Sequence, residues 1–390
     1  MDFAGLDPAP ALLEAFAARG IQHPTGIQKR IIPRLLAGES VLFESPTGTG
    51  KTFAYLLPLL RRAGEEQGRP ALLVLAPTYE LCAQIKGEAD FLLASGGRNG
   101  RELKTALLIG QANLSRQIET LKTEKPAVII GNPGRVLLLA RMGKLRFRDL
   151  TRLVLDEGDR LVADELVAET EALLRLIGRE RNGAPAQIAA CSATMPPQSR
   201  ERLLAFMDGA VIDGDDDGAP GKNLLHWAIF CERRGKTAAL RSFLAAAKPR
   251  KTLVFTSRAS EVGSTAARLQ HHHWAAAGLH GKMDQRERRR VLTGFRGGDV
   301  SVLITSDLAA RGLDIGGISH VIALDVPDNE NIYLHRAGRT ARAGNKGIMV
   351  SIGDAEEMRT LARIEKKLGI VVYPKELYGG KITVPESIDP

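Results

Sequence analysis

The chain has 390 residues, which is long for one globular core and suits two domains of ordinary size. Hydrophobic residues make up 44% and charged residues 25%, which excludes a disordered or fibrous protein, and no apolar run reaches the roughly 20 residues of a membrane-spanning helix. An acid at position 2, with no basic segment beside it, argues against a secretory signal. Three cysteines far apart in the sequence exclude a disulfide framework and favour a reducing, cytoplasmic location.

The positive charge is concentrated in the second half. Lys and Arg exceed Asp and Glu by 2 over residues 1–213 and by 9 over residues 223–390, and the formal net charge of the chain is +9. With a pI near 9.5, this balance favours an anionic partner such as nucleic acid. A basic but inert surface is the alternative that charge alone leaves open.

In the first half, short apolar runs alternate with helical patterns. Such unbroken runs are typical of strands that are buried on both faces of a parallel sheet. The predicted strands are VLFE (41–44), ALLVLA (71–76), TALLI (105–109), AVII (127–130), LVLD (153–156) and IAACS (188–192).

A polar stretch separates this half from the next. Residues 213–222, DGDDDGAPGK, hold no apolar anchor for a strand or helix and are typical of a linker. Beyond it the same alternation resumes, with predicted strands HWAIF (226–230), TLVF (252–255), SVLIT (301–305), HVIAL (320–324) and IMVSI (348–352).

Both halves are therefore predicted to be α/β domains, each a mostly parallel sheet with helices on both faces. We expect a first domain over 1–213, a flexible linker over 214–222, a second domain over 223–375 and a short tail over 376–390. Parallel sheets bind ligands at the carboxyl ends of their strands, so the residues that follow each run are the candidates for function.

The first predicted strand runs into SPTGTGKT (45–52) and then into a helical pattern. A glycine-rich turn between a strand and a helix points backbone N–H groups at phosphate oxygens, with the helix dipole behind them. Lys51 would reach the β- and γ-phosphates, and the Thr52 hydroxyl would bind Mg²⁺. Ser45 stands where the strict pattern has glycine, and a chance Gly/Thr turn is the alternative.

The run LVLD ends in a second acidic element, DEGD (156–159). Asp156, at the tip of a buried strand, is placed to hold Mg²⁺ through water, and Glu157 could orient or deprotonate the attacking water. A simple helix cap is the alternative for such acids. Together with the phosphate loop, this element predicts an NTP-binding ATPase domain.

A third element, HRAGRTARAG (335–344), spaces Arg336, Arg339 and Arg342 three residues apart. We expect the three arginines on one helical face, where an anion such as a γ-phosphate would offset their repulsion. A solvated basic face is the alternative, but no acids are interleaved with the arginines.

These elements closely resemble the DEAD-box family of ATP-dependent RNA helicases, in helicase superfamily 2, with DEGD in place of DEAD. The resemblance extends from residue 3 to the region of residue 370 and implies two tandem RecA-like domains that use ATP and Mg²⁺. It assigns catalysis to Lys51, Glu157, Arg339 and Arg342. It assigns nucleotide binding to Phe3 and Gln28 of the Q motif, to Ser45, Pro46, Thr47, Gly48, Thr49, Gly50, Lys51 and Thr52, to the ribose contact Asp314, and to the arginine fingers Arg339 and Arg342.

The resemblance also implies an RNA-binding set and a coupling set. The RNA-binding residues would be Pro77, Thr78, Glu80, Gly110, Asn132, Pro133, Gly134, Arg135, Arg258, Arg288, Thr305 and Asp307. The residues that couple ATP to RNA would be Asp159, Ser192, Thr194 and His335. Backbone amides, hydroxyls and single arginines at strand ends can hold phosphates without reading bases, so sequence-tolerant binding is expected.

Four positions depart from the family pattern. Gly158 replaces an alanine, Tyr79 an arginine and Asn132 a threonine, and Gln111 stands where the family has paired glycines. These departures weaken the RNA side more than the ATP side.

The expected function is RNA-stimulated ATP hydrolysis coupled to local unwinding of short RNA duplexes by closure of two lobes. The partners would be single-stranded and short duplex RNA, with a protein or ribonucleoprotein partner for targeting, and the chain is expected to be a monomer without membrane contact. One alternative is an ATP-gated RNA clamp or remodelling factor with little unwinding activity. Another is a DNA-directed motor of the same superfamily.

Overall fold

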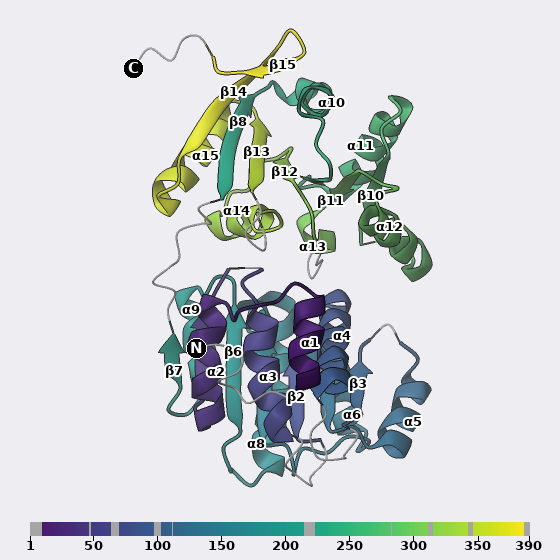
Figure 1. Cartoon of the computed structure of the whole chain (residues 1–390), viewed down its shortest axis with the longest axis vertical. Helices are drawn as coiled ribbons and strands as arrows, with labels where there is room; N and C mark the ends of the chain where they lie inside the picture. Colours follow the sequence, from purple (N-terminus) through teal and green to yellow (C-terminus); the bar gives the residue numbers. More distant parts are fainter. Residues whose placement is uncertain are drawn as a thin grey trace. The chain divides into compact units, whose positions relative to one another are not determined.

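The computed structural model describes residues 10–46, 48–63, 70–96, 103–110, 112–213, 223–281, 283–310, 315–341 and 346–385. The chain divides into two compact units, Met1–Asp217 and Gly218–Pro390. The division falls inside the predicted linker 214–222, which lies outside the described residues. Each unit is an α/β domain with its own sheet (Figure 1).

Among the described residues, the sheet of the first unit has seven strands in the order β3-β4-β2-β5-β6-β1-β7, and every pairing is parallel. Its strands are β1 (Val41–Glu44), β2 (Leu72–Leu75), β3 (Thr105–Leu108), β4 (Val128–Gly131), β5 (Arg152–Asp156), β6 (Gln187–Ser192) and β7 (Val211–Asp213). The unbroken apolar runs form these strands because the sheet is covered on both faces.

One face of this sheet packs against α1 (Pro10–Ala18), α2 (Gly26–Ala37), α3 (Lys51–Ala63) and α4 (Tyr79–Gly96). The other face packs against α5 (Leu114–Glu124), α6 (Pro133–Arg141), α7 (Gly158–Leu161), α8 (Val167–Glu180) and α9 (Pro197–Leu204). Two separate apolar cores therefore hold the central strands between them.

In the part of the chain that the structure describes, the second sheet has eight strands in the order β10-β11-β9-β12-β13-β8-β14-β15. They are β8 (Leu224–Phe230), β9 (Thr252–Phe255), β10 (Ala276–Leu279), β11 (Val302–Thr305), β12 (His320–Ala323), β13 (Gly347–Gly353), β14 (Val372–Tyr378) and β15 (Lys381–Thr383). The pairings recorded there are parallel except for the β14–β15 hairpin.

Helices again cover both faces of this sheet. One core is formed with α10 (Lys236–Ala247) and α11 (Ala259–His271). The other is formed with α12 (Gln285–Gly297), α13 (Asp307–Ala310), α14 (Glu330–Ala337) and α15 (Ala355–Leu368). The predicted fold class, two α/β domains with mostly parallel sheets, is confirmed.

The structure differs from the sequence prediction at the edges of the sheets. The second domain was expected to end at residue 375, but this position lies inside β14, and the hairpin continues the sheet to Thr383. β14 has no unbroken apolar run because it lies near the edge, where one side chain in two is exposed, and Pro374 is tolerated there. β10 was not predicted because its residues, Ala276–Leu279, are mostly small and do not form a strongly apolar run. Small residues are needed there because α11 packs closely: a Cβ at Gly278 would lie 3.1 Å from Val262.

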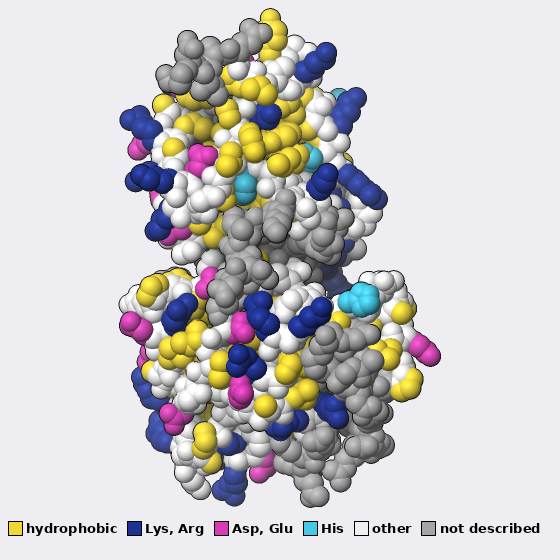
Figure 2. Space-filling view, turned by 60° about the vertical axis from the view of Figure 1, so that its left-hand side comes forward, with side chains coloured by type: hydrophobic (Ala, Val, Ile, Leu, Met, Phe, Trp, Pro, Cys, Tyr) yellow, Lys and Arg dark blue, Asp and Glu magenta, His cyan; other side chains and the backbone are white. Residues whose placement is uncertain are grey.

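The second unit has a surface patch of exposed hydrophobic residues. Figure 2 shows hydrophobic side chains gathered on one face of the second unit. Large exposed hydrophobic residues of β8 and β14 include Leu225, Phe230, Tyr373 and Tyr378. Among the described residues, no helix is both long and apolar enough to cross a bilayer.

His226 is a buried titratable group of the second unit. It lies on β8 with 4% of its surface exposed, and its ring stacks on Tyr333 of α14, whose hydroxyl is 2.9 Å from Nδ1. Burial lowers the pKa of His226 from 6.5 to about 4. The fold therefore favours the neutral imidazole.

Protonation of His226 should oppose folding. Because its pKa is lower in the folded than in the unfolded chain, its cost to stability appears as the pH falls from 6.5 toward 4. We expect the second unit to lose about 2 kcal/mol of its free energy of unfolding between pH 7 and pH 5 through this residue, and His226→Gln to lose correspondingly less. Trp227 and Trp274, the two tryptophans of the chain, both lie in this unit, so urea denaturation followed by their fluorescence measures it. Equal losses in both proteins would contradict this assignment.

Candidate functional site

The strand order of the first unit groups the candidate residues at the carboxyl ends of its strands. The phosphate loop follows β1, the DEGD element begins at the last residue of β5, and residues 192–194 begin at the last residue of β6. These three strands are neighbours in the order β5-β6-β1. The candidate RNA-binding residues follow β3, β4 and β2, which are also neighbours. Because parallel strands end at the same edge of a sheet, that edge carries two adjacent groups.

The phosphate loop is closed by its own polar side chains. Gly48 and Gly50 adopt left-handed conformations, with φ of 84° and 90°, which only glycine adopts readily. The Thr49 hydroxyl donates to the Pro46 carbonyl oxygen at 2.8 Å and lies 2.7 Å from the Ser45 hydroxyl. Ser45, the departure from the strict pattern, therefore supplies a hydroxyl that supports the loop.

Lys51 begins α3 directly after this loop. Its ammonium group donates to the carbonyl oxygens of Ser45 and Pro46, the latter at 3.2 Å. Burial lowers the pKa of Lys51, and the nearby Cys191 and Asp156 oppose that shift. Lys51 is half-buried, and a phosphate held in the loop would be a stronger partner for its ammonium group than two carbonyl groups. The adjacent Thr52 is half-buried.

Gln28 ties α2 to the phosphate loop. It is buried, its amide oxygen accepts from the Thr25 N–H at 2.9 Å, and its amide nitrogen donates to the Gly50 carbonyl at 3.1 Å. Thr25 caps α2 through the reciprocal capping box, a support that the sequence analysis missed although its Thr-x-x-Gln spacing is a known signature. Among the described residues, one amide hydrogen of Gln28 is used in the bond to Gly50, and the amide has a second that could bind a ligand.

Asp156 ends β5 and is buried, with 4% of its surface exposed. Its Oδ2 accepts from the Tyr55 hydroxyl at 2.7 Å, and its Oδ1 accepts from the Glu157 N–H at 2.9 Å and from the Cys191 thiol at 3.3 Å. Burial raises the pKa of Asp156, whereas the Tyr55 hydroxyl and the Lys51 ammonium oppose that rise. Tyr55 and Cys191 were missed because each is one residue of an ordinary apolar pattern.

The donors at this point fit Mg²⁺. Mg²⁺ prefers hard oxygen atoms and takes few protein ligands beside its waters, and the Asp156 carboxylate and the Thr52 hydroxyl supply such atoms. Three of the roughly four lone-pair positions of the carboxylate already accept hydrogen bonds. The remaining position suits a metal-bound water better than direct coordination by both oxygens.

Glu157 has a left-handed backbone, with φ of 51° and ψ of 49°. For non-glycine residues this conformation costs about 1 kcal/mol or more, and such strained residues cluster at functional sites. The conformation turns the chain from β5 into α7. The Glu157 carboxylate accepts from the Arg160 guanidinium at 3.2 Å.

Asp159 connects the DEGD element to β6 and to the phosphate loop. Its carboxylate accepts from the Ser192 hydroxyl, and the Ser192 carbonyl accepts from the Ser45 N–H at 3.0 Å. Burial raises the pKa of Asp159, against the hydrogen bond from Ser192. Thr194 is buried two residues further on. A displacement of Asp159, Ser192 or Ser45 would therefore be transmitted to the other two residues.

The RNA candidates of the first unit are held by hydrogen bonds to their own loops. The Thr78 hydroxyl accepts from Leu81 N–H at 3.3 Å, next to the half-buried Pro77 and Glu80. Asn132 caps α6 by accepting from the Arg135 N–H at 3.2 Å, and Pro133 is buried beside it. Gly134 lies next to the exposed Glu169 side chain, whose carboxylate would have to move to admit a Cβ at this position.

Arg135 was expected to bind RNA phosphate, but its guanidinium lies against the β3–α5 loop. It donates to the carbonyl oxygens of Gly110 at 2.6 Å and Ala112 at 3.2 Å, and to the Gln117 side chain at 3.3 Å. In this arrangement Arg135 fixes the path of that loop, and Gly110 remains exposed. Gln117 was missed, since nothing in the sequence relates it to Arg135.

In the second unit, the prediction of three arginines on one helical face is wrong. α14 ends at Ala337, so Arg339 lies beyond the helix, where it is 8% exposed, and Arg342 is outside the described residues. Arg336 is buried and forms a bidentate pair with Asp307 at 2.6 and 2.7 Å, and it donates to the Asp325 carbonyl at 2.6 Å. The anion opposite Arg336 is therefore a carboxylate of the protein.

The other candidates of the second unit vary in accessibility. Thr305 is fully buried, with its hydroxyl on the Ser306 carbonyl, so its side chain is closed to a ligand, contrary to the expectation. Arg258 is exposed, Arg288 is half-buried and donates to the Ala309 carbonyl at 2.9 Å, and His335 is half-buried. The predicted residues Phe3, Thr47, Asp314 and Arg342 lie outside the described residues, as does the departure Gln111.

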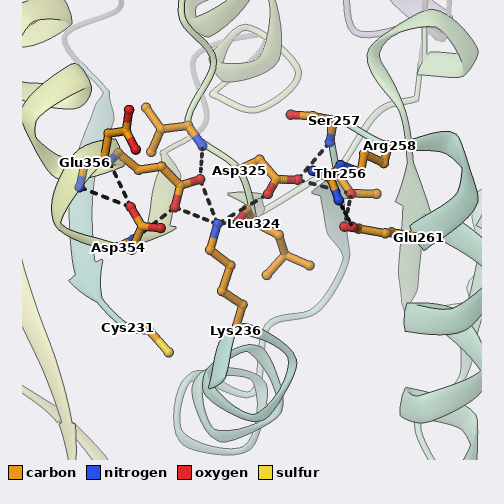
Figure 3. Close-up of polar contacts among 12 residues, drawn as sticks. Cys231, Lys236, Thr256, Ser257, Arg258, Glu261, Leu324, Asp325, Asp354 and Glu356 are labelled. Atoms are coloured by element: carbon orange, nitrogen blue, oxygen red, sulfur yellow. Dashed lines mark hydrogen bonds and ion pairs between the residues drawn. The ribbon is translucent and has the colours of Figure 1, made fainter. Parts of the chain in front are cut away.

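A buried ionic network at the strand ends of the second unit was missed by the sequence analysis (Figure 3). The Lys236 ammonium donates to the Leu324 carbonyl at 2.6 Å and pairs with Asp325 at 3.3 Å and Glu357 at 2.6 Å. Asp325 also accepts from the Ser257 N–H at 2.8 Å. Burial alone would raise the pKa of Asp325. The Ser257 amide and Lys236 together outweigh burial and hold the pKa below its usual value. The network fixes the loop that carries Arg258.

The fold and the site define a two-domain, phosphate-loop NTP-binding protein. Family models for a DEAD/DEAH box helicase and for a helicase conserved C-terminal domain match residues 25–203 and 235–344. The chain belongs to the DEAD-box family of ATP-dependent RNA helicases, and it is an enzyme of that class.

Similar proteins support this assignment. The chain is 38% identical to the DEAD-box ATP-dependent RNA helicase CshC of Bacillus cereus, over 96% of this chain and 93% of the relative. It is 35% identical to the probable ATP-dependent RNA helicase YfmL of Bacillus subtilis, over 95% of each. Among solved structures, S. cerevisiae Dbp5 bound to RNA and ADP BeF3 matches with a TM-score of 0.85 and 26% identity, over 97% of this chain and 96% of that one.

Replacement of Gly158 by alanine, the residue of the family pattern, should be tolerated. Gly158 has no positive φ, and a Cβ would lie 3.2 Å from Leu203 Cδ1, which can move by a few tenths of an ångström. We expect unchanged ATPase activity and a free energy of unfolding that is equal or up to about 1 kcal/mol higher, because alanine favours the start of α7.

The matched control is Gly131→Ala, whose Cβ would overlap the Leu108 carbonyl and lie 2.9 Å from Val136. Thermal denaturation of both variants measures the effect, and Gly131→Ala should be clearly destabilised. A Gly158→Ala protein that loses activity or stability like the control would contradict the expected geometry.

Proposed function

We propose that the chain couples RNA-stimulated ATP hydrolysis to local, sequence-tolerant unwinding of short RNA duplexes by closure of its two lobes. The observation that carries the proposal is the division of the first unit's strand ends into a nucleotide group on β5-β6-β1 and an RNA group on β3-β4-β2. Two ligands held at adjacent positions on one rigid sheet edge can influence each other through small movements of the shared loops.

On the ATP side, the loop amides, Lys51 and Thr52 would hold the phosphates, and the second amide hydrogen of Gln28 would bind the adenine edge. Asp156 would hold Mg²⁺ through water. Bound Mg²⁺ would supply a positive charge that stabilises the phosphoryl oxygens. Glu157 would orient the attacking water and accept its proton, and its strained backbone fixes the direction of its carboxylate.

Coupling would run through the contacts of Asp159, Ser192 and Ser45, which join the acidic element, β6 and the phosphate loop. The arginine fingers Arg339 and Arg342 belong to the second unit, so a complete ATP site would require both lobes. RNA contacts are divided in the same way between residues 77–135 and 258–307. Each ligand would then favour closure and so favour the other.

RNA would be held by its backbone. Among the described residues at the RNA half of the edge, Gly110 is exposed and Thr78, Glu80 and Asn132 are half-buried. Small polar groups of this kind can contact a phosphate backbone without reading bases. The relative solved with RNA and ADP BeF3 is consistent with a nucleotide and RNA bound to the same kind of fold. A cytoplasmic location and a monomeric state stay predictions.

One observation favours the alternative, an ATP-gated clamp with little unwinding activity. The guanidinium of Arg135 and the amide oxygen of Asn132 are engaged within the protein, and Tyr79 replaces the usual cation. Fewer charged contacts would weaken the force that separates strands while leaving backbone binding possible.

Glu157→Gln should stall ATP hydrolysis and leave ATP binding nearly intact. Glutamine keeps the shape of the side chain and, like glutamate, carries the cost of the left-handed backbone, so only the base is lost. We expect hydrolysis to fall by 10²-fold or more in a steady-state ATPase assay with saturating RNA. Lys51→Ala is the comparison, since it should impair both binding and hydrolysis. Near-normal turnover of Glu157→Gln would refute the assigned role.

ATP and RNA should bind cooperatively. We expect single-stranded RNA to tighten the binding of a non-hydrolysable ATP analogue by about 5- to 150-fold, and the analogue to tighten RNA by the same factor. Fluorescence titrations of each ligand with and without the other measure both factors, and DNA of the same sequence serves as the control. No coupling would overturn the two-lobe mechanism.

A strand-displacement assay separates the two candidate functions. Unwinding that requires ATP turnover supports the helicase, whereas RNA binding stabilised by the analogue without displacement supports the clamp. Equal ATPase stimulation by DNA and RNA would instead favour a DNA-directed motor.

A further inference from the structure

Helix α12 (Gln285–Gly297) of the second unit carries an unusual charge pattern. It holds five arginines and a single acid, Glu287. At 100° per residue, Arg286, Arg289, Arg290 and Arg296 fall within an arc of about 120° on one side of the helix, and Glu287 lies outside that arc. All four side chains are exposed. These four residues are called the arginine face below.

The opposite side of α12 faces the core. Leu292 and Phe295 are buried there, and Val291 packs against them. Arg288, the residue that the family resemblance assigns to RNA, lies on this inner side and donates to the Ala309 carbonyl at 2.9 Å. The arginine face therefore points away from the strand-end residues that form the proposed RNA site. α12 covers the sheet near β10, at the edge opposite β15 (Figure 1).

The arginine face is not paired with acidic side chains in the part of the chain that the structure describes. Within the described ranges, none of its four arginines forms an ion pair. Like charges three and four positions apart, as at Arg286 with Arg289 and Arg290, repel each other and destabilise a helix.

The exposed side of α15 (Ala355–Leu368) shows the usual arrangement. Arg359, Arg363 and Lys366 are exposed there, but they share the helix with Glu356, Glu357 and Glu365. Mixed charges suit a face that meets only water, whereas a face of one sign suits a polyanion.

We propose that the arginine face is a second RNA-binding surface, which holds the phosphate backbone of RNA that extends beyond the strand-end site. The inference rests on the proposed RNA-dependent function and adds a contact to it. The helix is about 20 Å long, so its arginines can meet several consecutive phosphates. Guanidinium groups bind phosphate in a bidentate manner, and this geometry is independent of base sequence.

The composition of the surface favours RNA over an acidic protein. Between the arginines the helix exposes Thr293 and Gly297, with no aromatic or large aliphatic side chain. Protein interfaces need a buried apolar centre for most of their binding energy, and this surface offers none. A backbone contact that is mainly electrostatic requires only the charges.

The test compares two triple variants of the full chain. In Arg286→Gln/Arg289→Gln/Arg290→Gln the arginine face loses three charges, and glutamine preserves helix propensity. The matched control is Arg359→Gln/Arg363→Gln/Lys366→Gln on α15, which removes the same charge from the same unit. Fluorescence anisotropy measures the affinity for a short single-stranded RNA and for a duplex with a single-stranded overhang, at several salt concentrations and without ATP.

We expect the arginine-face variant to bind the duplex with the overhang at least 10-fold more weakly at low salt. A plot of the logarithm of the RNA affinity against the logarithm of the salt concentration should become less steep by about 2, since each of three lost phosphate contacts removes about 0.7 from the slope. The control should keep a slope close to that of the wild type, and both variants should keep the wild-type ATPase rate at saturating RNA. Wild-type affinity and slope in the arginine-face variant would overturn the proposal, and so would an equal loss in the control.

Failure of the proposed function would be distinct from failure of this inference. If RNA does not stimulate the ATPase activity, the helicase proposal is refuted. If the RNA affinity nevertheless depends on the arginine face, the proposal of a second RNA-binding surface still holds.

Discussion

Parallel strand pairing is the constraint on which the rest of this structure depends. It places the carboxyl end of every strand of the first unit at one edge, so loops that are more than 100 residues apart in sequence become neighbours. The phosphate loop after β1 and the acidic element after β5 are separated only by β6. The backbone contact between Ser45 and Ser192 follows directly from that order. The chemistry of the site is therefore a consequence of topology before it is one of side chains.

The same edge concentrates groups that are costly to bury. Asp156 and Asp159 are buried and Lys51 is half-buried, and this loss of contact with water is the main physical cause of their shifted pKa values. Hydrogen bonds from Tyr55, Cys191 and Ser192 meet part of that cost. In the second unit, ion pairs between Lys236 and Asp325 and between Arg336 and Asp307 offset the cost of burying these charges. In both units these contacts fix the positions of charged side chains at the strand ends.

The central strands and the nucleotide loop could be predicted from sequence because their patterns are local. An unbroken run such as LLVL indicates a strand by itself, and a glycine-rich turn between strand and helix indicates its own ligand. Edge strands such as β14 lack that pattern, because exposure on one face permits polar residues and proline. Contacts between distant residues were not predictable. Arg336 was assigned to a phosphate because nothing in the sequence pairs it with Asp307, and Arg135 was assigned to RNA because its loop contacts arise only in the fold.

The position of β1 in the first sheet has a consequence for how the protein is made. β1 carries the phosphate loop and is complete by residue 44, but its two neighbours are β6 and β7, which end at residues 192 and 213. Arg30 of α2 then pairs with Asp213 at 3.0 Å, at the last residue of β7. At 5–20 residues per second, a ribosome needs roughly 10–30 s to synthesise the intervening chain. For that interval an apolar strand has neither of its partners, so the segment that would bind ATP is synthesised well before the strands that hold it in the sheet.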